Sequence, residues 1–584
     1  MRVVSRVYWN YPNDNPDIIP RPKAMEQILS NGHQTFFEIS IRLPNSCHAI
    51  KIYRCTGCGR ILMSKTGAIT HQCCCEKQFI MGIPNAPKQM IMDLYLRAIA
   101  TTNASFRSAE DENMRLCLHC LNPSFELPGR DKLRQLMIEL AQRIRMQMLE
   151  NLRYRVVSLM IDGCKRWGKL YEGVVIYTSE RLYLYSILKV RDGTARTLEE
   201  ILAEVIETLK RNNTTVVSIN SDNASVNLAA LNGDLQNLTE SHFIRQPCAA
   251  HTLNLAIQDT FLKNPRARRI YEAIDLLVSC PPETTIRVGY SKKLATIRWI
   301  SLFSCVDFIY LHKQQYQQIR IQKISEALQH IENEIGLEKL HEIMNIMRPF
   351  LSAIERDRAS IADIIPAFIH AQSRLIWMSD WLSKVLLGNL LIRFTTTCSL
   401  HLPWVAYFLT GYGLNYFRYS NPNKQAEFRE MTTRALNIYM IERHIPEEKR
   451  NKNLQAFMTY LNDADVDVVK EYQFNPVMYW RLRQIADKND EFSKVAEEIL
   501  QIPATEAACE RVFSSLSAAT KSERCNVQEQ TLDARLTVKF ECIFNRAGKV
   551  SLDELASDPQ KALKLSKYSF PTREHDNHVD QGDD

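Results

Sequence analysis

One stretch, residues 153 to 260, constrains the fold most, because two kinds of hydrophobic pattern alternate along it. Three runs rich in β-branched and aromatic residues come first, in "RVVSLMIDG", "YEGVVIYTS" and "RLYLYSILKV". Short polar turns separate them, which is typical of a strand meander. The pattern then predicts a helix in "TLEEILAEVIETLKRN", a strand in "TTVVSINSD", a helix from Ala224, a strand in "HFIRQPC" and a helix in "AAHTLNLAIQDTF".

The first of these helices shows the clearest amphipathic pattern. Thr197 stands three residues before Glu200, which predicts a capping box. One apolar stripe runs along it: Leu198, Ile201, Leu202, Val205, Ile206 and Leu209. The order of three strands, helix, strand, helix, strand and helix describes an α/β domain with an RNase H-like mixed sheet, in which strands one and four are neighbours.

Two aspartates close strands of this predicted sheet. Asp162 closes the first strand in "MIDG", and Asp222 closes the fourth in "INSDN". If those strands are neighbours, both side chains lie in one crevice, where carboxylates repel and need a cation between them. Magnesium prefers such oxygen ligands, and two ions can assist a phosphodiester displacement. Asp-Gly and Asp-Asn are also ordinary turn formers, and spacing alone leaves that alternative open.

Near the C-terminus, "IPATEAACERVFSSLS" places Glu506 and Glu510 on one helix face. Pro503 suits the first turn of a helix, so Glu506 is expected close to the start, where a carboxylate stabilises the helix dipole. Glu510 lies one turn deeper. Composition adds little, since a net charge of +7 permits a nucleic-acid partner without requiring one. No charged segment followed by an apolar core opens the chain, so no secretory signal is expected.

The 16 cysteines are therefore expected as thiols or metal ligands. Cys55, Cys58, His71 and Cys75 have the spacing of a tetrahedral structural zinc site. Cys73 or Cys74 can replace Cys75 as the fourth ligand, and chance clustering of thiols is the alternative. Cys117 and Cys120 have no second ligand pair nearby and are interpreted as small buried residues of a helix.

The most apolar run, residues 382 to 414, is interrupted by Arg393, His401 and Pro403, which favours a buried helix pair over a membrane span. Long amphipathic helices fill residues 281 to 480. Together with the strand region, this pattern predicts an α/β domain and a large all-helical part.

Several motifs, in order, resemble the hAT superfamily of DNA transposases. They are "SDNASVNLAAL", "CAAHTLNLAIQD", "ATIRWIS" and "PATEAACERVFSSLSAATKSERCNVQEQTLDARLTVKF". The cysteine-rich segment resembles a BED-type zinc finger, and "NASFRSAEDENMRLCLHCLNPSFELPGRDKL" resembles the helical segment that follows it in this family. The resemblance extends in patches from about residue 45 to 545.

The resemblance implies a domain organisation. A helical insertion interrupts the RNase H-like domain, and the C-terminal motif belongs to a dimerisation region. The implied ranges are an irregular segment 1–44, a BED-type finger 45–86, a helical DNA-binding and dimerisation segment 87–152, the first part of the catalytic domain 153–280, the insertion 281–485, the last part 486–545 and a tail 546–584.

The resemblance also implies an acidic triad. The family's Asp-Gly-Trp-Thr motif corresponds to "DGCK" here, so Asp162 matches and Cys164 replaces the tryptophan. Asp222 matches the second aspartate and Glu510 the glutamate, which leaves Glu506 as a capping or supporting residue. These three residues are expected to hold Mg²⁺ or Mn²⁺ and to activate water and then a 3′-hydroxyl.

The resemblance also implies that further residues contact DNA. His251 would orient a phosphate oxygen or leaving group, or is a half-buried structural histidine; Cys248 is a small buried residue. Trp299 of "TIRW", which is one residue longer than the family motif, would stack on a flipped base or anchor the core, and Arg298 would bind a phosphate.

The expected function is cut-and-paste transposition in the nucleus, by an at least dimeric protein that binds double-stranded DNA at transposon terminal repeats. In this family a hairpin forms on the flanking DNA. The alternative is a domesticated DNA-binding or scaffold protein that kept the fold without catalysis. A third idea is that the finger is a protein-interaction module.

Overall fold

A computed structural model describes residues 88–121, 125–280, 299–471, 475–520 and 528–544, and the backbone of four strands nearer the N-terminus. The chain divides into two compact units, Met1–Leu140 with Asn545–Asp584, and Ala141–Phe544.

The first unit contains an antiparallel sheet in the order β1 (Ile18–Lys23), β2 (Phe36–Arg42), β3 (Ala49–Cys55) and β4 (Ile61–Leu62). The segment 1–44, expected to be irregular, therefore holds two strands. Pro20 and Pro22 lie in β1, which is an edge strand, where a residue without an N–H is tolerated. Three helices follow: α4 (Lys88–Thr102), η1 (Phe106–Glu110) and α5 (Glu112–Leu121); α6 (Arg130–Leu152) connects to the second unit.

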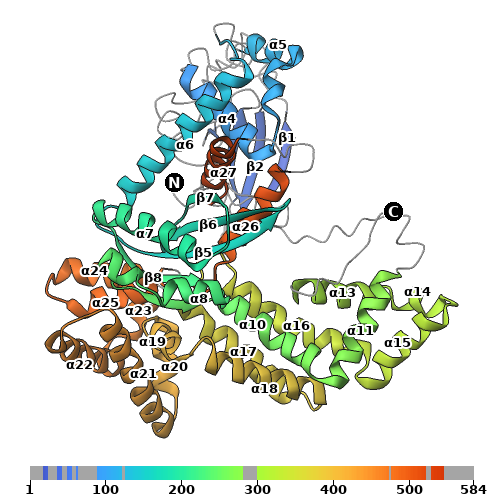
Figure 1. The fold of residues 1–584 in the computed structure, drawn as a ribbon, viewed down its shortest axis with the longest axis vertical. Helices are drawn as coiled ribbons and strands as arrows, with labels where there is room; N and C mark the ends of the chain where they lie inside the picture. Colours follow the sequence, from blue (N-terminus) through green and yellow to red (C-terminus); the bar gives the residue numbers. More distant parts are fainter. Residues whose placement is uncertain are drawn as a thin grey trace. The chain divides into compact units, whose positions relative to one another are not determined.

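The second unit is built on a five-stranded mixed sheet (Figure 1). Its strands are β5 (Val156–Arg166), β6 (Lys169–Tyr177), β7 (Leu182–Val190), β8 (Thr215–Ser221) and β9 (Ile244–Pro247), in the order β7-β6-β5-β8-β9. The pairs β5–β6 and β6–β7 are antiparallel, whereas β5–β8 and β8–β9 are parallel. The first and fourth strands of this sheet are therefore neighbours, as the sequence predicted.

Helices cover both faces of the sheet. On one face, α7 (Ala195–Arg211) buries all six residues of its predicted stripe, together with α8 (Ser225–Leu231), α9 (Leu235–Thr239) and the end of α6. On the other face lie α26 (Ala507–Ala519) and α27 (Glu529–Phe544). The predicted capping box of α7 is wrong: Thr194 is the N-cap, and its hydroxyl accepts the N–H of Thr197, because the helix begins one turn earlier.

A helical region separates β9 from α26 in the sequence, and the described residues between 299 and 485 are mainly helical, as the sequence pattern predicted. It begins with α10 (Ala249–Gln258), η2 (Asp259–Lys263) and α11 (Pro265–Ser279). The remaining described elements are α13 (Trp299–Leu311), α14 (Lys313–Gln318), α15 (Gln322–Glu334), α16 (Leu337–Ile354), η3 (Ile361–Asp363), α17 (Ile364–Trp377), α18 (Trp381–Thr396), α19 (His401–Phe408), α20 (Gly411–Tyr419), α21 (Pro422–Glu442), α22 (Glu447–Asp463), α23 (Val466–Glu471), α24 (Pro476–Ala486) and α25 (Glu491–Leu500).

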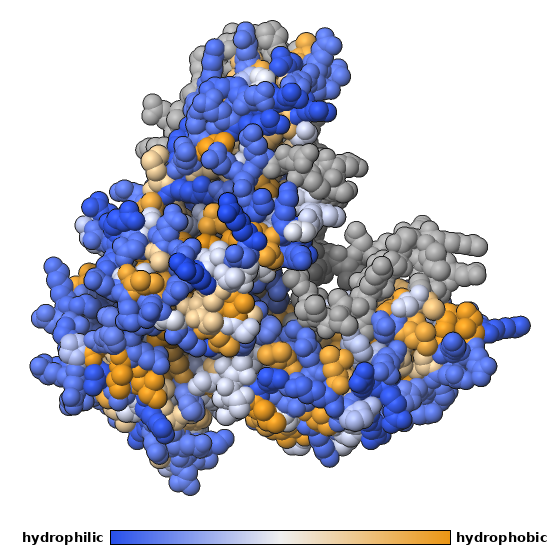
Figure 2. Space-filling model, viewed as in Figure 1, coloured by the Kyte–Doolittle hydropathy of each residue, from blue (hydrophilic) through white to orange (hydrophobic). Residues whose placement is uncertain are grey.

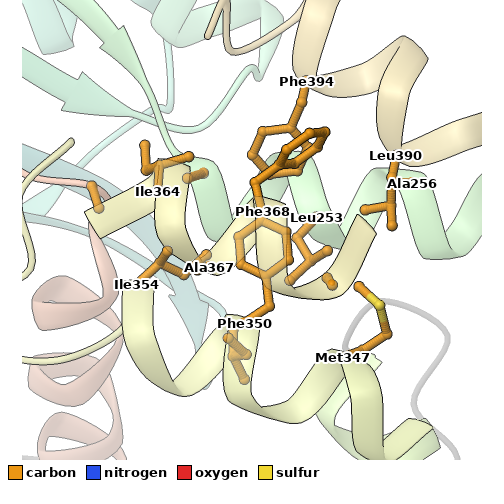
Figure 3. Close-up of a cluster of buried hydrophobic side chains, with 14 of the residues drawn as sticks. Leu253, Ala256, Met347, Phe350, Ile354, Ile364, Ala367, Phe368, Leu390 and Phe394 are labelled. Atoms are coloured by element: carbon orange, nitrogen blue, oxygen red, sulfur yellow. The ribbon is translucent and has the colours of Figure 1, made fainter. Parts of the chain in front are cut away.

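Phenylalanine packing joins part of this region (Figure 3). Phe350 of α16, Phe368 of α17 and Phe394 of α18 have ring centroids 5.4 to 6.2 Å apart and contact the same core as Leu253 and Ala256 of α10. Because α10 follows β9 directly, this core fixes the helical region to the end of the sheet.

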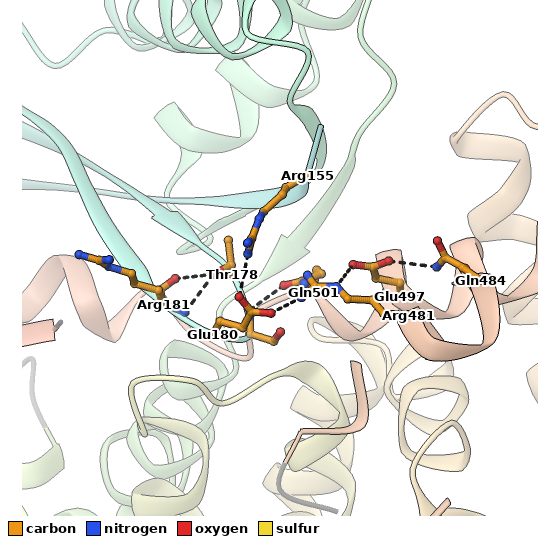
Figure 4. Close-up of polar contacts among 9 residues, drawn as sticks. Arg155, Thr178, Glu180, Arg181, Arg481, Gln484, Glu497 and Gln501 are labelled. Carbon is orange, nitrogen blue, oxygen red and sulfur yellow. Dashed lines mark hydrogen bonds and ion pairs between the residues drawn. The ribbon is translucent and has the colours of Figure 1, made fainter. Parts of the chain in front are cut away.

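A second attachment is polar (Figure 4). Glu180, in the turn between β6 and β7, accepts from Arg155 at 2.7 Å and is also paired with Arg481 of α24. Arg481 in turn contacts Glu497 of α25 at 2.6 Å. One arginine therefore links the sheet to two helices through carboxylates that are mostly shielded from water.

The apolar run from residue 382 folds as α18 and α19. In the part of the chain that the structure describes, no single helix is long and apolar enough to cross a membrane, and these two pass that test only as a pair bent by 86°. Leu382, Leu386 and Leu390 are buried, as expected for a buried helix pair. On the face seen in Figure 2, hydrophobic residues form separate groups among hydrophilic ones.

Candidate functional site

Asp162 and Asp222 lie at the same level of the sheet. Asp222 follows the end of β8 as predicted, but the prediction that Asp162 closes its strand is wrong, because antiparallel pairing with β6 continues β5 to Arg166. Met160 of β5 pairs with Asn220 of β8 in parallel register, and the next two residues of each strand lead to Asp162 and Asp222. Neighbouring strands are about 4.8 Å apart, so the two backbones come close at this edge. Strand order and register together therefore bring Asp162 and Asp222 close to each other, and the space around these two residues is called the acidic crevice below.

Local hydrogen bonds hold both carboxylates. Asp222 Oδ1 accepts the N–H of Ala224 at 2.9 Å and the side-chain amide of Asn227 at 2.6 Å, where α8 begins. Asp162 Oδ1 accepts the N–H of Gly163 at 2.8 Å. Asp222 is thus a turn former as well, so its structural role and its position in the crevice are compatible.

Helix α26 brings a glutamate from the far end of the sequence. The Cys509 thiol lies 3.4 Å from the carbonyl oxygen of Met160, and Phe513 packs against Gly173 of β6. Glu510 lies in the first turn of this helix, and its charge acts on Asp162. The structure therefore brings Asp162, Asp222 and Glu510 into one electrostatic environment.

The segment before α26 is fixed by bonds to two other elements. The side-chain amide of Asn220 donates to the carbonyl of Pro503 at 3.1 Å, and the N–H of Ala249 donates to the carbonyl of Ala504 at 2.9 Å. Arg511 also bonds the carbonyl of Glu355 at 3.1 Å. These contacts determine where the helix starts relative to β8 and α10.

The site concentrates negative charge. Burial, together with the charges of Asp222 and Glu510, raises the pKa of Asp162 to about 8, against a lowering by the Gly163 N–H. Burial and the charge of Asp222 raise the pKa of Glu172, on β6, to about 7. Burial is the largest cause of both shifts, and repulsion from the neighbouring carboxylates adds to it.

Carboxylate oxygens are the ligands that Mg²⁺ and Mn²⁺ prefer, so the chemistry of these residues fits a hard divalent cation. The positions of these side chains, however, do not yet form a metal-binding site. Over residues 88–121, 125–280, 299–471, 475–520 and 528–544, no three His, Cys, Asp or Glu side chains already form a group that could hold a metal ion. The acidic groups interact electrostatically, and their oxygens must draw closer to share an ion.

His251 also belongs to this region. It lies in the first turn of α10 and is half-buried. Burial lowers its pKa, while the carboxylates of Asp222 and Glu510 act in the opposite direction. A neutral imidazole beside the acidic residues can contact a phosphate oxygen or a leaving group. Cys248, the N-cap of this helix, is buried as expected, and its sulfur accepts the N–H of His251 at 3.3 Å.

Glu506 differs from expectation. Helix α26 begins at Ala507, so Pro503 lies outside its first turn and instead pairs with Ser360. Glu506 is the N-cap residue but its side chain makes no capping bond, and only 6% of it is exposed. Burial and the charge of Asp162 raise its pKa well above the usual range. The position of Glu506 at the start of the helix is therefore confirmed, whereas the capping role of its side chain is wrong.

Glu172 was missed by the sequence analysis. It stands in the hydrophobic strand "YEGVVIY" and pairs with Gly163, the residue after Asp162. A signal was present: a tight turn at Trp167–Gly168 fixes the antiparallel register that sets Glu172 beside "DG". Unless the turn at Trp167–Gly168 is recognised in the sequence, nothing distinguishes Glu172 from any other polar residue in a strand.

Other predicted residues fall outside what the structure describes. Of the zinc ligands, Cys55 ends β3, but its side chain is not described, nor are Cys58, His71 and Cys75. Arg298 is outside the described residues, and Trp299 is placed only as the first backbone position of α13. The side chains of Cys117 and Cys120 are likewise outside the description.

Comparison with known proteins gives one family match. Residues 456–541 match the hAT family C-terminal dimerisation region, which here runs from the last part of α22 through α23, α24, α25 and α26 to most of α27. Over that region the chain is similar to hAT transposase-like proteins. No match was found among curated protein sequences.

One of the solved structures that match this chain is the "Drosophila P element transposase strand transfer complex". It shares 13% sequence identity, covers 61% of this chain and 92% of its own, and has a TM-score of 0.23. A score of this size aligns no individual site residues, so the assignments above rest on the geometry of this chain.

Proposed function

We propose that this chain is a hAT-type DNA transposase with an RNase H-like catalytic domain, in which Asp162, Asp222 and Glu510 form the acidic triad. The observation that best supports this proposal is that Asp162 of β5 is buried, and that the charges of Asp222, after β8, and of Glu510, on α26, both act on it and raise its pKa. A structural role alone gives no reason to gather them there, because burying like charges is unfavourable.

These residues would hold Mg²⁺ or Mn²⁺, which when bound lowers the pKa of water and stabilises charge on phosphate oxygens. Water then attacks phosphorus, the P–O3′ bond breaks, and the released 3′-hydroxyl takes a proton. In the second step that hydroxyl attacks a phosphodiester of target DNA and displaces another 3′-oxygen. His251 would contact an oxygen that gains charge in either step.

The same proposal includes the partners. A dimer through the region 456–541 follows from the description of the matching family model. Double-stranded DNA carrying terminal repeats is the substrate, the nucleus is the compartment, and a BED-type zinc finger within residues 45–86 is a separate DNA-binding module. Size-exclusion chromatography with light scattering tests the dimer, and zinc analysis of the full chain tests the finger.

The function is tested by cleavage of a plasmid that carries candidate terminal repeats, with magnesium or manganese. Wild type, Asp162→Ala, Asp222→Ala and Glu510→Ala are compared with Asp533→Asn. Asp533 is an acidic residue of α27 that bonds Arg145 at 2.6 Å and accepts the N–H of Ile187 at 3.1 Å, so this variant controls for the loss of a carboxylate outside the triad. We expect the triad variants to lose at least about a hundredfold in activity; equal activity in all of them would refute the triad.

A second candidate is a domesticated DNA-binding protein without catalysis. The observation in its favour is that the acidic residues do not yet form a three-ligand group within the described residues. It predicts DNA binding by wild type without cleavage at any divalent metal concentration.

A further inference from the structure

The turn between β5 and β6 is built from an unusual pair of residues. Arg166 pairs with Lys169, so Trp167 and Gly168 are the two central residues of a hairpin turn. Both have positive φ, 52° at Trp167 and 74° at Gly168, as in a type I′ turn. Such turns favour Asn-Gly, and a bulky aromatic residue at positive φ is disfavoured. Folding therefore gives no reason for a tryptophan at this position.

The tip of the hairpin is also exposed and cationic. Trp167 keeps 57% of its surface exposed, although a tryptophan normally covers much of its apolar area. Lys165 and Lys169 are exposed on either side. Arg166 is half-buried, and its Nε has no hydrogen-bond partner among the residues that the structure describes. Residues 165 to 169 thus present one aromatic face among three positive charges and no acidic residue.

The tip is rigidly related to the acidic crevice, because both belong to the same two strands. Asp162 and Glu172 lie on β5 and β6, and the ladder continues without a break through Cys164–Tyr171, Lys165–Leu170 and Arg166–Lys169. Five residues of strand span about 16 Å. About five nucleotides of one strand of duplex DNA, at 3.4 Å per nucleotide, cover the same length. A DNA strand with a phosphodiester in the crevice therefore has bases within reach of the tip.

We propose that this hairpin tip, residues Lys165 to Lys169, binds the DNA next to the reacting phosphodiester, with Trp167 stacking on an unpaired base. Lys165, Arg166 and Lys169 contact the flanking phosphates. Aromatic stacking requires a base whose face is free, whereas the cations bind any phosphate backbone. The inference rests on the proposed function, since it takes DNA as the substrate of the acidic crevice.

Three variants distinguish the effects of stacking, folding and charge. Trp167→Asn removes the ring and creates the Asn-Gly sequence that a type I′ turn prefers, so we expect a melting temperature equal to or above that of wild type. Trp167→Tyr keeps an aromatic face. Lys165→Gln removes one exposed charge and leaves Trp167 in place.

Binding is measured with the full chain in EDTA, which prevents metal-dependent cleavage, by fluorescence anisotropy. The two probes are a labelled blunt duplex of arbitrary sequence and the same duplex with a short unpaired internal bubble. Trp167→Asn should weaken bubble binding by about tenfold and change blunt-duplex binding less than about twofold. Trp167→Tyr should retain most bubble binding. Lys165→Gln should weaken both probes equally and reduce the salt dependence by about one ion.

Equal affinity of wild type and Trp167→Asn for the bubble probe would overturn the inference, as would an equal loss on both probes. These outcomes are distinct from failure of the proposed function. If wild type never cleaves but the bubble-specific loss occurs, the tip binds DNA and the transposase assignment fails. If cleavage depends on the triad and Trp167→Asn binds both probes normally, only the inference about the tip fails.

Discussion

Gly163 and Glu172 face each other across the β5–β6 pair, and a Cβ atom added to Gly163 would lie 2.8 Å from Glu172 Oε1. The carboxylate of Glu172 thus rests directly on the backbone beside Asp162. Its charge contributes to the raised pKa of Asp162, after burial, Asp222 and Glu510. Glycine at position 163 is what allows a fourth acidic residue to approach the crevice.

Gly163→Ala should therefore displace the Glu172 carboxylate without unfolding the protein, because the end of a glutamate side chain can move. We expect a loss of stability of less than about 1 kcal/mol and a loss of cleavage similar to that of Glu172→Gln. The check is thermal unfolding together with the plasmid cleavage assay. Gly163→Ala with normal activity beside an inactive Glu172→Gln would contradict this explanation.

The raised pKa of Asp162 predicts how stability depends on pH. Its value is 3.8 in the unfolded chain and about 8 in the folded one, so the folded state binds the proton more tightly. The stabilisation is fully present below pH 3.8 and is lost as the pH rises through about 8. Metal-free protein should therefore lose stability between these values, and Asp162→Asn should flatten the slope.

Divalent metal should reverse that trend, because it binds the ionised carboxylates of the folded state. Thermal unfolding in EDTA and in excess magnesium, at about pH 6 and about pH 8, measures both effects. The magnesium stabilisation should be larger at the higher pH and absent in Asp162→Asn. An equal magnesium effect in wild type and variant would place the metal elsewhere.

The two glutamates of α26 should respond differently to the same change. Glu510→Gln removes a charge that acts on Asp162 and should abolish cleavage, with a loss of at least about a hundredfold. Glu506→Gln replaces a buried acid whose pKa is raised by burial, so cleavage should change by less than about threefold and stability should not fall. Parallel cleavage assays compare them, and an inactive Glu506→Gln would assign this residue a direct role.

Arg481 should be the most sensitive position of the polar attachment between the sheet and the helical region. Arg481→Met leaves Glu180 and Glu497 without their shared partner, and we expect a loss of about 3 kcal/mol in urea unfolding. The control is Arg196→Met, because the pair of Arg196 with Glu200 on α7 is exposed and should change stability by less than about 0.5 kcal/mol. Similar effects of both variants would show that the shared position of Arg481 is unimportant.

The sequence by itself determined the elements and their order. Periodicity of two or 3.6 residues is a local property, so it located the strands from β5 to β9 and the buried stripe of α7. It also placed Asp222 at the end of a strand, whereas Asp162 lies inside β5 because pairing with β6 continues that strand to Arg166. The exact starts of α7 and α26 were missed, since Thr197 and Pro503 each fit a cap that neighbouring residues supply instead.

Only the tertiary structure decided which acidic residues share an environment. Glu510 reaches Asp162 because α26 packs across β5 and β6, and Glu172 does so because the turn at Trp167 fixes the strand register. Glu506, one helical turn from Glu510, is enclosed instead beside Cys248. Local patterns specify which face of an element is buried, but charge interactions depend on distances between elements remote in sequence, and packing alone sets those distances.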